Sequence, residues 1–147
     1  LQKDQVFVVC PHPVMKNDIV EKKYDNIFVL RDFSTNDLML VSDLLVTDYS
    51  SVIFEYALLN KPIAFFCYDL STYDRGFYLN YPDDLPGDIY ENQDALTEYL
   101  IHRERHVITD RYRTFTERYM SACDGHSCER IAALINDYME KGESGDE

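Results

Sequence analysis

The chain has 147 residues, 46% of them hydrophobic, which is enough for one ordinary domain with a core and too little for two. Its formal net charge of −13 argues against nucleic acid or an anionic membrane as a partner of the whole surface. No apolar run approaches the roughly 18 residues of a transmembrane helix and no signal peptide is evident, so we expect a soluble polypeptide. Because the chain begins at Leu1 and enters a strand-like run almost at once, we expect a piece of a longer protein.

Apolar runs and helical periodicities alternate along the chain. The apolar runs predict strands at residues 6–10, 26–30, 43–47, 63–67 and 88–90. Helical spacing predicts helices at residues 14–24, 37–42, 52–59, 92–102 and 106–120, and a last one from about residue 125. This alternation predicts an α/β fold with a parallel sheet and helices on both faces.

Polar corners follow several of the predicted strands. They lie at residues 11–13, 48–51 and 69–75, and a tyrosine-rich loop extends the last of them to residue 87. Ligands of parallel sheets gather outside the carboxyl ends of the strands. We therefore expect these corners to face one crevice, and we expect the long loop to be functional. The domain is predicted to span residues 1–141, with residues 142–147 as an acidic, disordered tail.

The most informative corner carries paired serines between a buried strand and a helix. Ser50 and Ser51 follow Asp48-Tyr49 and precede the apolar helix, so either serine is a candidate N-cap. The first N–H groups of a helix lack partners and its dipole favours negative charge, so the hydroxyls there are also candidates to hold a phosphate. Capping and phosphate binding are compatible.

Other residues near these corners are candidates for phosphate chemistry. His12, between two prolines, is a candidate to neutralise a diphosphate or to pass a proton, with an inconsequential loop histidine as the alternative. Arg75 precedes Gly76, and a guanidinium matches phosphate well, although an ion pair with a neighbouring aspartate is equally open. For the acids Asp48 and Glu55 we expect hydrogen bonds to turn amides and to a ribose, respectively.

A second turn precedes the last predicted helix. Gly125 and His126 in this turn are candidates to face the same ligand, with capping of the helix as the alternative. Cys123 and Cys128 place two thiols near His126, but a zinc site needs a further ligand and a second knuckle. We therefore expect reduced thiols, no metal site and no cofactor.

A series of short motifs runs along nearly the whole chain. In order they are Ser42-Asp43, Val46-Thr47-Asp48-Tyr49-Ser50-Ser51, Phe54-Glu55, Lys61-Pro62, Tyr68-Asp69, Arg75-Gly76-Phe77-Tyr78, Asp84-Leu85-Pro86-Gly87 and Asp124-Gly125. In combination they resemble the CDP-glycerol glycerophosphotransferase family, which comprises the teichoic acid polymerases and primases of Gram-positive bacteria. No single motif is specific by itself.

The resemblance implies a GT-B enzyme built of two Rossmann-like domains, of which this chain matches the C-terminal, donor-binding one. In that family an acceptor hydroxyl attacks the β-phosphate of CDP-glycerol and expels CMP. His12 matches the donor-side histidine, and a partner histidine in the N-terminal domain would be the base. Ser50 and Ser51 match the serines at the donor pyrophosphate, and Arg75 matches the arginine of its motif. Cys10, where a basic residue is common, departs from the family pattern.

His126 is a second departure, because lysine or asparagine is common there. The resemblance further implies CDP-glycerol or CDP-ribitol as donor and a polyol-phosphate or lipid-linked acceptor, with no nucleic acid. It implies a cytoplasmic enzyme, peripheral at the inner face of the cell membrane. The polyol and the choice between primase and polymerase are not readable from these residues.

Two other readings remain open at the level of sequence. One is a GT-B glycosyltransferase domain that uses a nucleotide sugar, which a preference for UDP-linked over CDP-linked donors would favour. The other is a non-catalytic flavodoxin-like or receiver-like module, for which Asp48 would be the candidate phosphate acceptor. A receiver also needs an acidic pair after the first strand, where this chain has His12.

Overall fold

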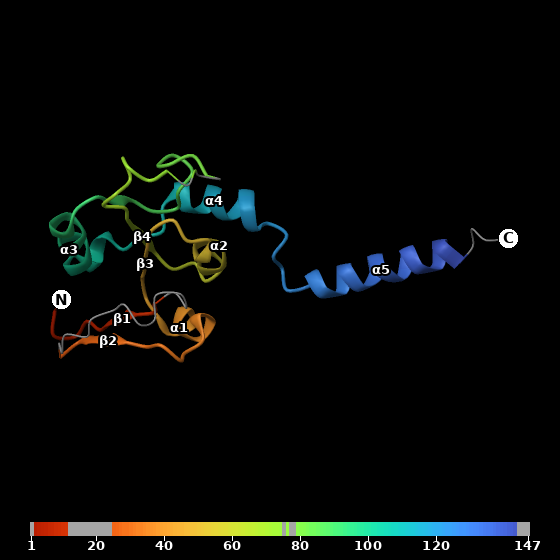
Figure 1. Ribbon diagram of the computed structural model, residues 1–147, viewed down its shortest axis with the longest axis horizontal. Helices are drawn as coiled ribbons and strands as arrows, with labels where there is room; N and C mark the ends of the chain where they lie inside the picture. The colour runs from red at the N-terminus through yellow and green to blue at the C-terminus, as the bar shows by residue number, and fades with distance from the viewer. Residues whose placement is uncertain (1, 12–24, 75, 77–78, 144–147) are drawn as a thin grey trace.

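The computed structural model describes residues 2–11, 25–74, 76 and 79–143 (Figure 1). The predicted helix at residues 14–24 lies outside them. The strands are β1 (Phe7–Val9), β2 (Ile27–Val29), β3 (Leu45–Thr47), β4 (Ile63–Phe66) and β5 (Ile89–Tyr90). The helices are α1 (Thr35–Val41), α2 (Val52–Ala57), α3 (Gln93–Ile101), the short 3₁₀ helix η2 (Arg103–Arg105), α4 (Asp110–Met120) and α5 (Ser127–Glu143). The predicted strands are confirmed, each one or two residues shorter than expected.

All described strand pairs are parallel, as predicted, but they form two sheets. β1 pairs with β2, and β3, β4 and β5 form a second sheet in that order. The prediction of a single sheet is therefore wrong for the described backbone. β3 pairs with β4, and the N–H of Leu45 extends this pairing to the carbonyl of Pro62. In Figure 1, β1 and β2 lie below the other strands.

Helices cover both faces of the β3–β4–β5 sheet, as predicted. Alternate residues of β4 point to opposite faces. Ala64 packs with Leu96 and Tyr99 of α3 on one face. Phe65, which is fully buried, belongs to the larger cluster built from α2 and α4 on the other face. The sheet is thus the centre of the core.

The helix starts follow their capping residues. Asn92 accepts a hydrogen bond from the N–H of Ala95 at 2.9 Å and starts α3. Thr109 accepts one from the N–H of Tyr112 at 3.2 Å, and this cap explains why α4 begins at Asp110 and not near residue 106 as predicted.

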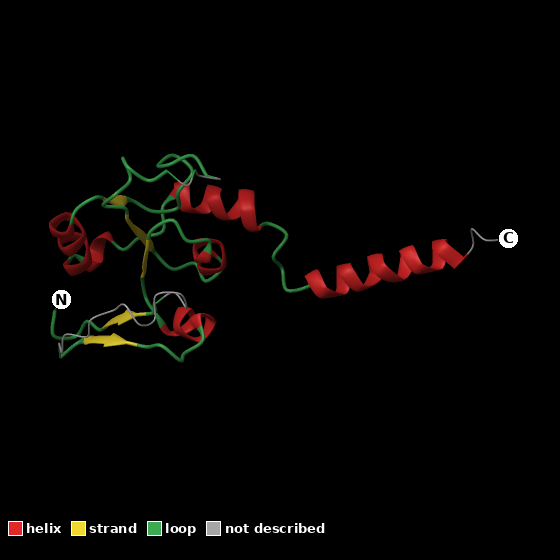
Figure 2. Cartoon of the chain, in the orientation of Figure 1, coloured by secondary structure: helices red, strands yellow, loops and turns green. Residues whose placement is uncertain are grey.

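Between β4 and β5 the described residues form loop throughout, which confirms the long irregular stretch (Figure 2).

The long loop returns to the sheet at Gly87. A Cβ atom at this position would lie 1.9 Å from the carbonyl oxygen of Ile63. No side chain fits there, because real Cβ atoms essentially never approach within 3.0 Å of a non-bonded heavy atom. Gly87 therefore lets the backbone pass closely over β4 just before β5 begins.

The C-terminal end of α1 is tied to the turn before β4. The ammonium group of Lys61 donates hydrogen bonds to the carbonyl oxygens of Leu40 at 2.8 Å and of Ser42 at 2.6 Å. The Ser42 hydroxyl donates to the hydroxyl oxygen of the buried Tyr56 at 3.1 Å. A cation at the end of a helix satisfies carbonyl groups that have no partner within the helix. These bonds fix where the chain enters β3 and, through it, where the corner at residues 48–51 lies.

Candidate functional site

The paired serines lie at the carboxyl end of β3, as predicted. β3 ends at Thr47 and α2 begins at Val52, so the corner between them consists of residues 48–51. Ser50 and Ser51 are exposed. The corner therefore presents two hydroxyl groups to solvent at the edge of the sheet where ligands of parallel sheets bind.

The two serines differ in their local contacts. Ser51 stands at the N-cap position of α2, but its side chain makes no capping hydrogen bond. Its backbone is already helical, with φ −66° and ψ −9°, whereas a capping side chain requires an extended conformation. The Ser50 hydroxyl instead accepts a long bond of 3.4 Å from the N–H of Val52. Capping thus involves Ser50 weakly and leaves the Ser51 hydroxyl without a role in the helix.

Tyr49 joins this corner to the loop after β4. Its hydroxyl donates a hydrogen bond to a carboxylate oxygen of Asp69 at 2.9 Å. Its ring stacks on the ring of Tyr73, with the centroids 3.8 Å apart. The sequence predicted that the corners at residues 48–51 and 69–75 face one crevice, and these contacts show that the two corners do meet.

Tyr81 brings the far end of the tyrosine-rich loop to the same place. Its hydroxyl bonds the carbonyl of Asp48 at 3.4 Å, and its ring centroid lies 5.7 Å from that of Tyr49. Its ring also meets the edge of Phe65 in β4, at 6.3 Å. Aromatic side chains beside the serines therefore hold three segments together: the corner at residues 48–51, the corner at residues 69–75 and the part of the loop around Tyr81. The loop was predicted from sequence to be functional, but this role of its tyrosines was not, although tyrosine is frequent between residues 68 and 81.

Burial and nearby carboxylates keep the Tyr49 phenol and the Cys67 thiol neutral. Burial, followed by the hydrogen bond to Asp69, raises the pKa of Tyr49 well above its ordinary value. Burial is also the main reason why the pKa of the Cys67 thiol rises to about 11, and the carboxylates of Asp48, Asp69 and Glu91 add to it. Neither the phenol nor the thiol is an anion near neutral pH, so both act as donors or packing groups and not as nucleophiles.

The predicted acids of this corner are exposed. Asp48 contacts the site through its backbone carbonyl, which accepts from Tyr81, and not through the turn amides that we expected its carboxylate to bond. Glu55 lies in the first turn of α2 and is exposed. Its predicted contact with a ribose stays a prediction.

Two predicted site residues lie outside the described part of the chain. They are His12 and Arg75, whose roles therefore stay predictions. Gly76, next to Arg75, is described and has φ 75°, a left-handed conformation that glycine adopts without strain.

Gly125 and His126 occupy a separate turn, beyond the end of α4 (Figure 1). The N–H of His126 donates to the carboxylate of Asp124 at 3.0 Å, and its ring contacts Glu129 at 3.0 Å. Gly125 has φ 84°. The hydrogen bonds described for this turn stay within residues 120–130, which supports the capping alternative. A role of these residues toward the ligand of the serine corner stays a prediction.

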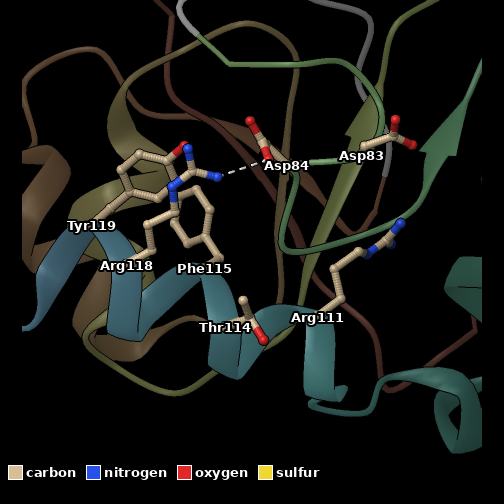
Figure 3. Close-up of a pocket in the computed structure, with 7 residues that line it drawn as sticks. All are labelled: Asp83, Asp84, Arg111, Thr114, Phe115, Arg118 and Tyr119. Atoms are coloured by element: carbon tan, nitrogen blue, oxygen red, sulfur yellow. Dashed lines mark hydrogen bonds and ion pairs between the residues drawn. The ribbon is translucent and has the colours of Figure 1, made fainter.

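A cavity of about 210 Å³ lies elsewhere, between α4 and the loop before β5 (Figure 3). It is lined by Asp83, Asp84, Arg111, Thr114, Phe115, Arg118 and Tyr119. Arg118 pairs with Asp84 at 3.2 Å, and Arg111 with Asp88 at 2.6 Å. These two ion pairs link α4 to the loop before β5.

Among the described residues, His, Cys, Asp and Glu form no group of three or more that could hold a metal ion. No helix in this part of the chain is long and apolar enough to cross a membrane. Of the cysteines, Cys67 is buried, and Cys10, Cys123 and Cys128 are exposed free thiols.

Comparison with known families assigns the chain. Residues 1–137 match the family described as CDP-Glycerol:Poly(glycerophosphate) glycerophosphotransferase. The chain belongs to this family. The resemblance noted from the motifs is thereby confirmed.

Curated relatives carry teichoic acid functions. The chain is 38% identical over 143 residues to the teichoic acid ribitol-phosphate primase of Bacillus spizizenii, covering 95% of this chain and 36% of the relative. It is 36% identical over 144 residues to the teichoic acid poly(glycerol phosphate) polymerase of Staphylococcus epidermidis, covering 92% of this chain and 20% of the relative. The chain thus spans between about a fifth and just over a third of the length of these relatives.

The fold also matches solved structures of the wall teichoic acid polymerase TagF. One TagF structure superposes with a TM-score of 0.79 at 33% identity, over 93% of this chain and 35% of that chain. Another, of a TagF variant soaked with CDPG, gives a TM-score of 0.78 at 33% identity, over 93% of this chain and 35% of that chain. The glycerophosphotransferase family and the mixed α/β fold with parallel sheets are therefore supported by sequence and by structure.

Proposed function

We propose that this chain is the donor-binding part of an enzyme that moves a polyol phosphate from a CDP-linked donor to a teichoic acid acceptor. The observation that carries the proposal is the pair of exposed serine hydroxyls at the carboxyl end of β3, in a chain of this family. The TagF variant soaked with CDPG supports a CDP-polyol as the donor. Family membership favours this reading over a nucleotide-sugar transferase or a receiver-like module.

In this proposal the chain corresponds to the C-terminal half of a GT-B enzyme. An acceptor hydroxyl attacks the β-phosphorus of the donor, the bond from that phosphorus to the bridging oxygen breaks, and CMP leaves with the oxygen. Ser50, Ser51 and the first N–H groups of α2 would hold the pyrophosphate. Arg75 would add a cation, and His12 would protonate or neutralise the leaving phosphate. The base that accepts the proton of the attacking hydroxyl would come from another part of the full-length protein.

The wider setting of the enzyme is part of the proposal. The donor would be CDP-glycerol or CDP-ribitol, because relatives of both kinds match this chain. The acceptor would be a polyol-phosphate chain or its lipid-linked primer. A lipid-linked acceptor would place the full-length protein at the inner face of the cell membrane, as a peripheral protein.

The serine corner can be tested by titration of the full-length protein with CDP-glycerol. Loss of hydrogen bonds to a charged group costs roughly 1.5–3 kcal/mol, so Ser50→Ala/Ser51→Ala should raise the Kd about tenfold to a hundredfold. Ser121→Ala, which removes another exposed hydroxyl at the end of α4, is the matched control and should leave the Kd unchanged. An unchanged Kd in the double variant would contradict the proposed phosphate site. Tighter binding of UDP-linked than CDP-linked donors would favour the nucleotide-sugar reading.

A further inference from the structure

The motif Asp84-Leu85-Pro86-Gly87 fixes the last part of the tyrosine-rich loop to the core. The side chain of Leu85 is fully buried, and Gly87 passes closely over the backbone of Ile63 in β4. Residues 80–87 of this loop are called the arm. The arm is therefore anchored at its C-terminal end by burial and by close backbone contact.

Asp84 holds the other end of the arm. Its N–H donates to the carbonyl of Asn80 at 2.8 Å, and one of its carboxylate oxygens accepts from the N–H of Asn80 at 3.2 Å. The other carboxylate oxygen accepts from the guanidinium of Arg118 in α4, also at 3.2 Å (Figure 3). One side chain thus closes the start of the arm into a turn, and α4 holds this side chain in place.

Aromatic rings position the guanidinium of Arg118. It lies over the ring of Tyr119, 5.1 Å from the ring centroid, where a cation is attracted to the ring face. The ring of Tyr119 lies 5.7 Å from that of Phe54 in α2 and 5.0 Å from that of the buried Phe115. The packing that joins α2 to α4 therefore also sets the direction in which Arg118 extends.

Tyr81 connects the arm to the serine corner. Its hydroxyl donates to the carbonyl of Asp48 at 3.4 Å, and its ring centroid lies 5.7 Å from that of Tyr49. Asp48 and Tyr49 immediately precede Ser50 in the chain. A continuous series of contacts thus runs from Arg118 through the arm to the corner.

A second ion pair between α4 and the same loop lacks this connection. Arg111 pairs with Asp88 at 2.6 Å. The sheet already fixes Asp88, because its carbonyl accepts from the N–H of Phe65 at 2.9 Å, and it follows the close passage at Gly87. Both guanidinium groups are partly exposed, and such ion pairs add little to stability. The two pairs therefore share their chemistry but differ in what they hold.

We propose that Arg118 is a positioning residue of the donor site. Through its bond to Asp84 it holds the arm, and the arm holds Tyr81 against the corner that presents Ser50 and Ser51. This effect on donor binding requires no contact between Arg118 and the donor. The inference rests on the donor site proposed above, so its test includes a measurement without donor.

The first test is titration of the full-length protein with CDP-glycerol. Arg118→Gln should raise the Kd roughly threefold to fivefold, the upper range that one partly exposed ion pair supplies. Arg118→Lys keeps a cation for Asp84 and should bind within about twofold of the wild type. Arg111→Gln is the matched control. It should lower the urea midpoint about as much as Arg118→Gln does, but it should leave the Kd unchanged.

A double variant tests the route through Asp84. Asp84→Asn keeps an acceptor for the N–H of Asn80 but removes the charge that Arg118 meets. If the arginine acts through this carboxylate, adding Arg118→Gln to Asp84→Asn should raise the Kd no further. Additive increases would overturn the proposal, because they would mean that Arg118 affects the donor by another route.

The measurement without donor is nitration of Tyr49 by tetranitromethane, followed by peptide mass spectrometry. Nitration requires that the reagent reach the ring, so Tyr49 should react several-fold faster in Arg118→Gln than in the wild type. Arg111→Gln should react at the wild-type rate. An unchanged rate in Arg118→Gln, or equal increases in the two variants, would overturn the proposal.

The serine variant separates this inference from the proposed function. If Ser50→Ala/Ser51→Ala weakens binding of CDP-glycerol but Arg118→Gln does not, the proposed phosphate site stands and the role of Arg118 is wrong. If the serine variant binds normally, the phosphate site is wrong. The nitration rates then still decide whether Arg118 holds the corner.

Discussion

The hydroxyl of Tyr49 donates a hydrogen bond of 2.9 Å to the carboxylate of Asp69, and this contact joins the corners that follow β3 and β4. The ring of Tyr73, which also follows β4, stacks on the ring of Tyr49 and supports this contact. Ser50 is the next residue along the chain after Tyr49. The orientation of the proposed phosphate site therefore depends on a phenol that need not itself touch the donor.

Tyr49→Phe should separate positioning of the serine corner from folding. The variant keeps the stacked ring but loses the bond to Asp69, so the free energy of unfolding should fall by only about 1 kcal/mol. A less ordered corner should raise the KM for the CDP-polyol several-fold in the full-length enzyme. Tyr68→Phe, which removes an exposed hydroxyl from the same loop, is the control and should change neither quantity. If Tyr49→Phe alters stability but leaves the KM at its wild-type value, the phenol has only a structural role.

Cys67 should be the slowest of the cysteines to react with thiol reagents. It is buried and its pKa is raised to about 11, while Cys10, Cys123 and Cys128 are exposed. At pH 8 the raised pKa of about 11 leaves Cys67 with about a hundredfold less thiolate than its ordinary pKa of 9.0 would, and burial slows its reaction further. Alkylation of the native protein followed by peptide mass spectrometry measures each rate. Labelling of Cys67 as fast as Cys123 would contradict the buried, protonated thiol.

The same shift predicts a pH dependence of stability. The folded state raises the pKa of Cys67 from 9.0 to about 11, so it binds the proton more tightly than the unfolded chain. The stabilisation is therefore complete below pH 9 and is lost as the pH rises from 9 to 11. Urea midpoints measured across this range should fall more steeply for the wild type than for Cys67→Ala. Parallel curves would show that the tyrosines, and not Cys67, dominate the alkaline loss.

Features encoded locally were predictable from sequence. The strands and most helices follow from apolar runs and periodicity, and the serine corner was placed correctly because a strand, a turn and a helix are adjacent in the chain. Of the two serines predicted as candidate caps, Ser50 accepts only a long bond from Val52, and Ser51 makes no capping bond because its backbone is already helical. Sequence gives the residue type at such a position, but not its backbone angles.

Features that depend on distant residues were not predictable. The bond from Tyr49 to Asp69 spans 20 positions, and the one from Lys61 to Leu40 spans 21. The separation of β1 and β2 from the other strands is likewise a property of pairing between segments. Periodicity describes which face of an element is apolar, but it does not state which other element meets that face.

Lys61 should contribute measurably to stability, although from sequence it was named only within a short motif. Its ammonium group caps the carbonyls of Leu40 and Ser42 at 2.8 and 2.6 Å, at the point where the chain enters β3. Lys61→Met keeps the aliphatic stem and leaves these carbonyls without the cation. Because bonds to charged groups contribute roughly 1.5–3 kcal/mol when protected from water and less when partly exposed, we expect a loss of about 1–2 kcal/mol in urea unfolding. Lys141→Met is the matched control, since it removes an exposed ion pair with Asp137 and should cost no more than about 0.5 kcal/mol. Equal losses in the two variants would mean that the end of α1 is held by packing alone, and that the position of β3 does not depend on this lysine.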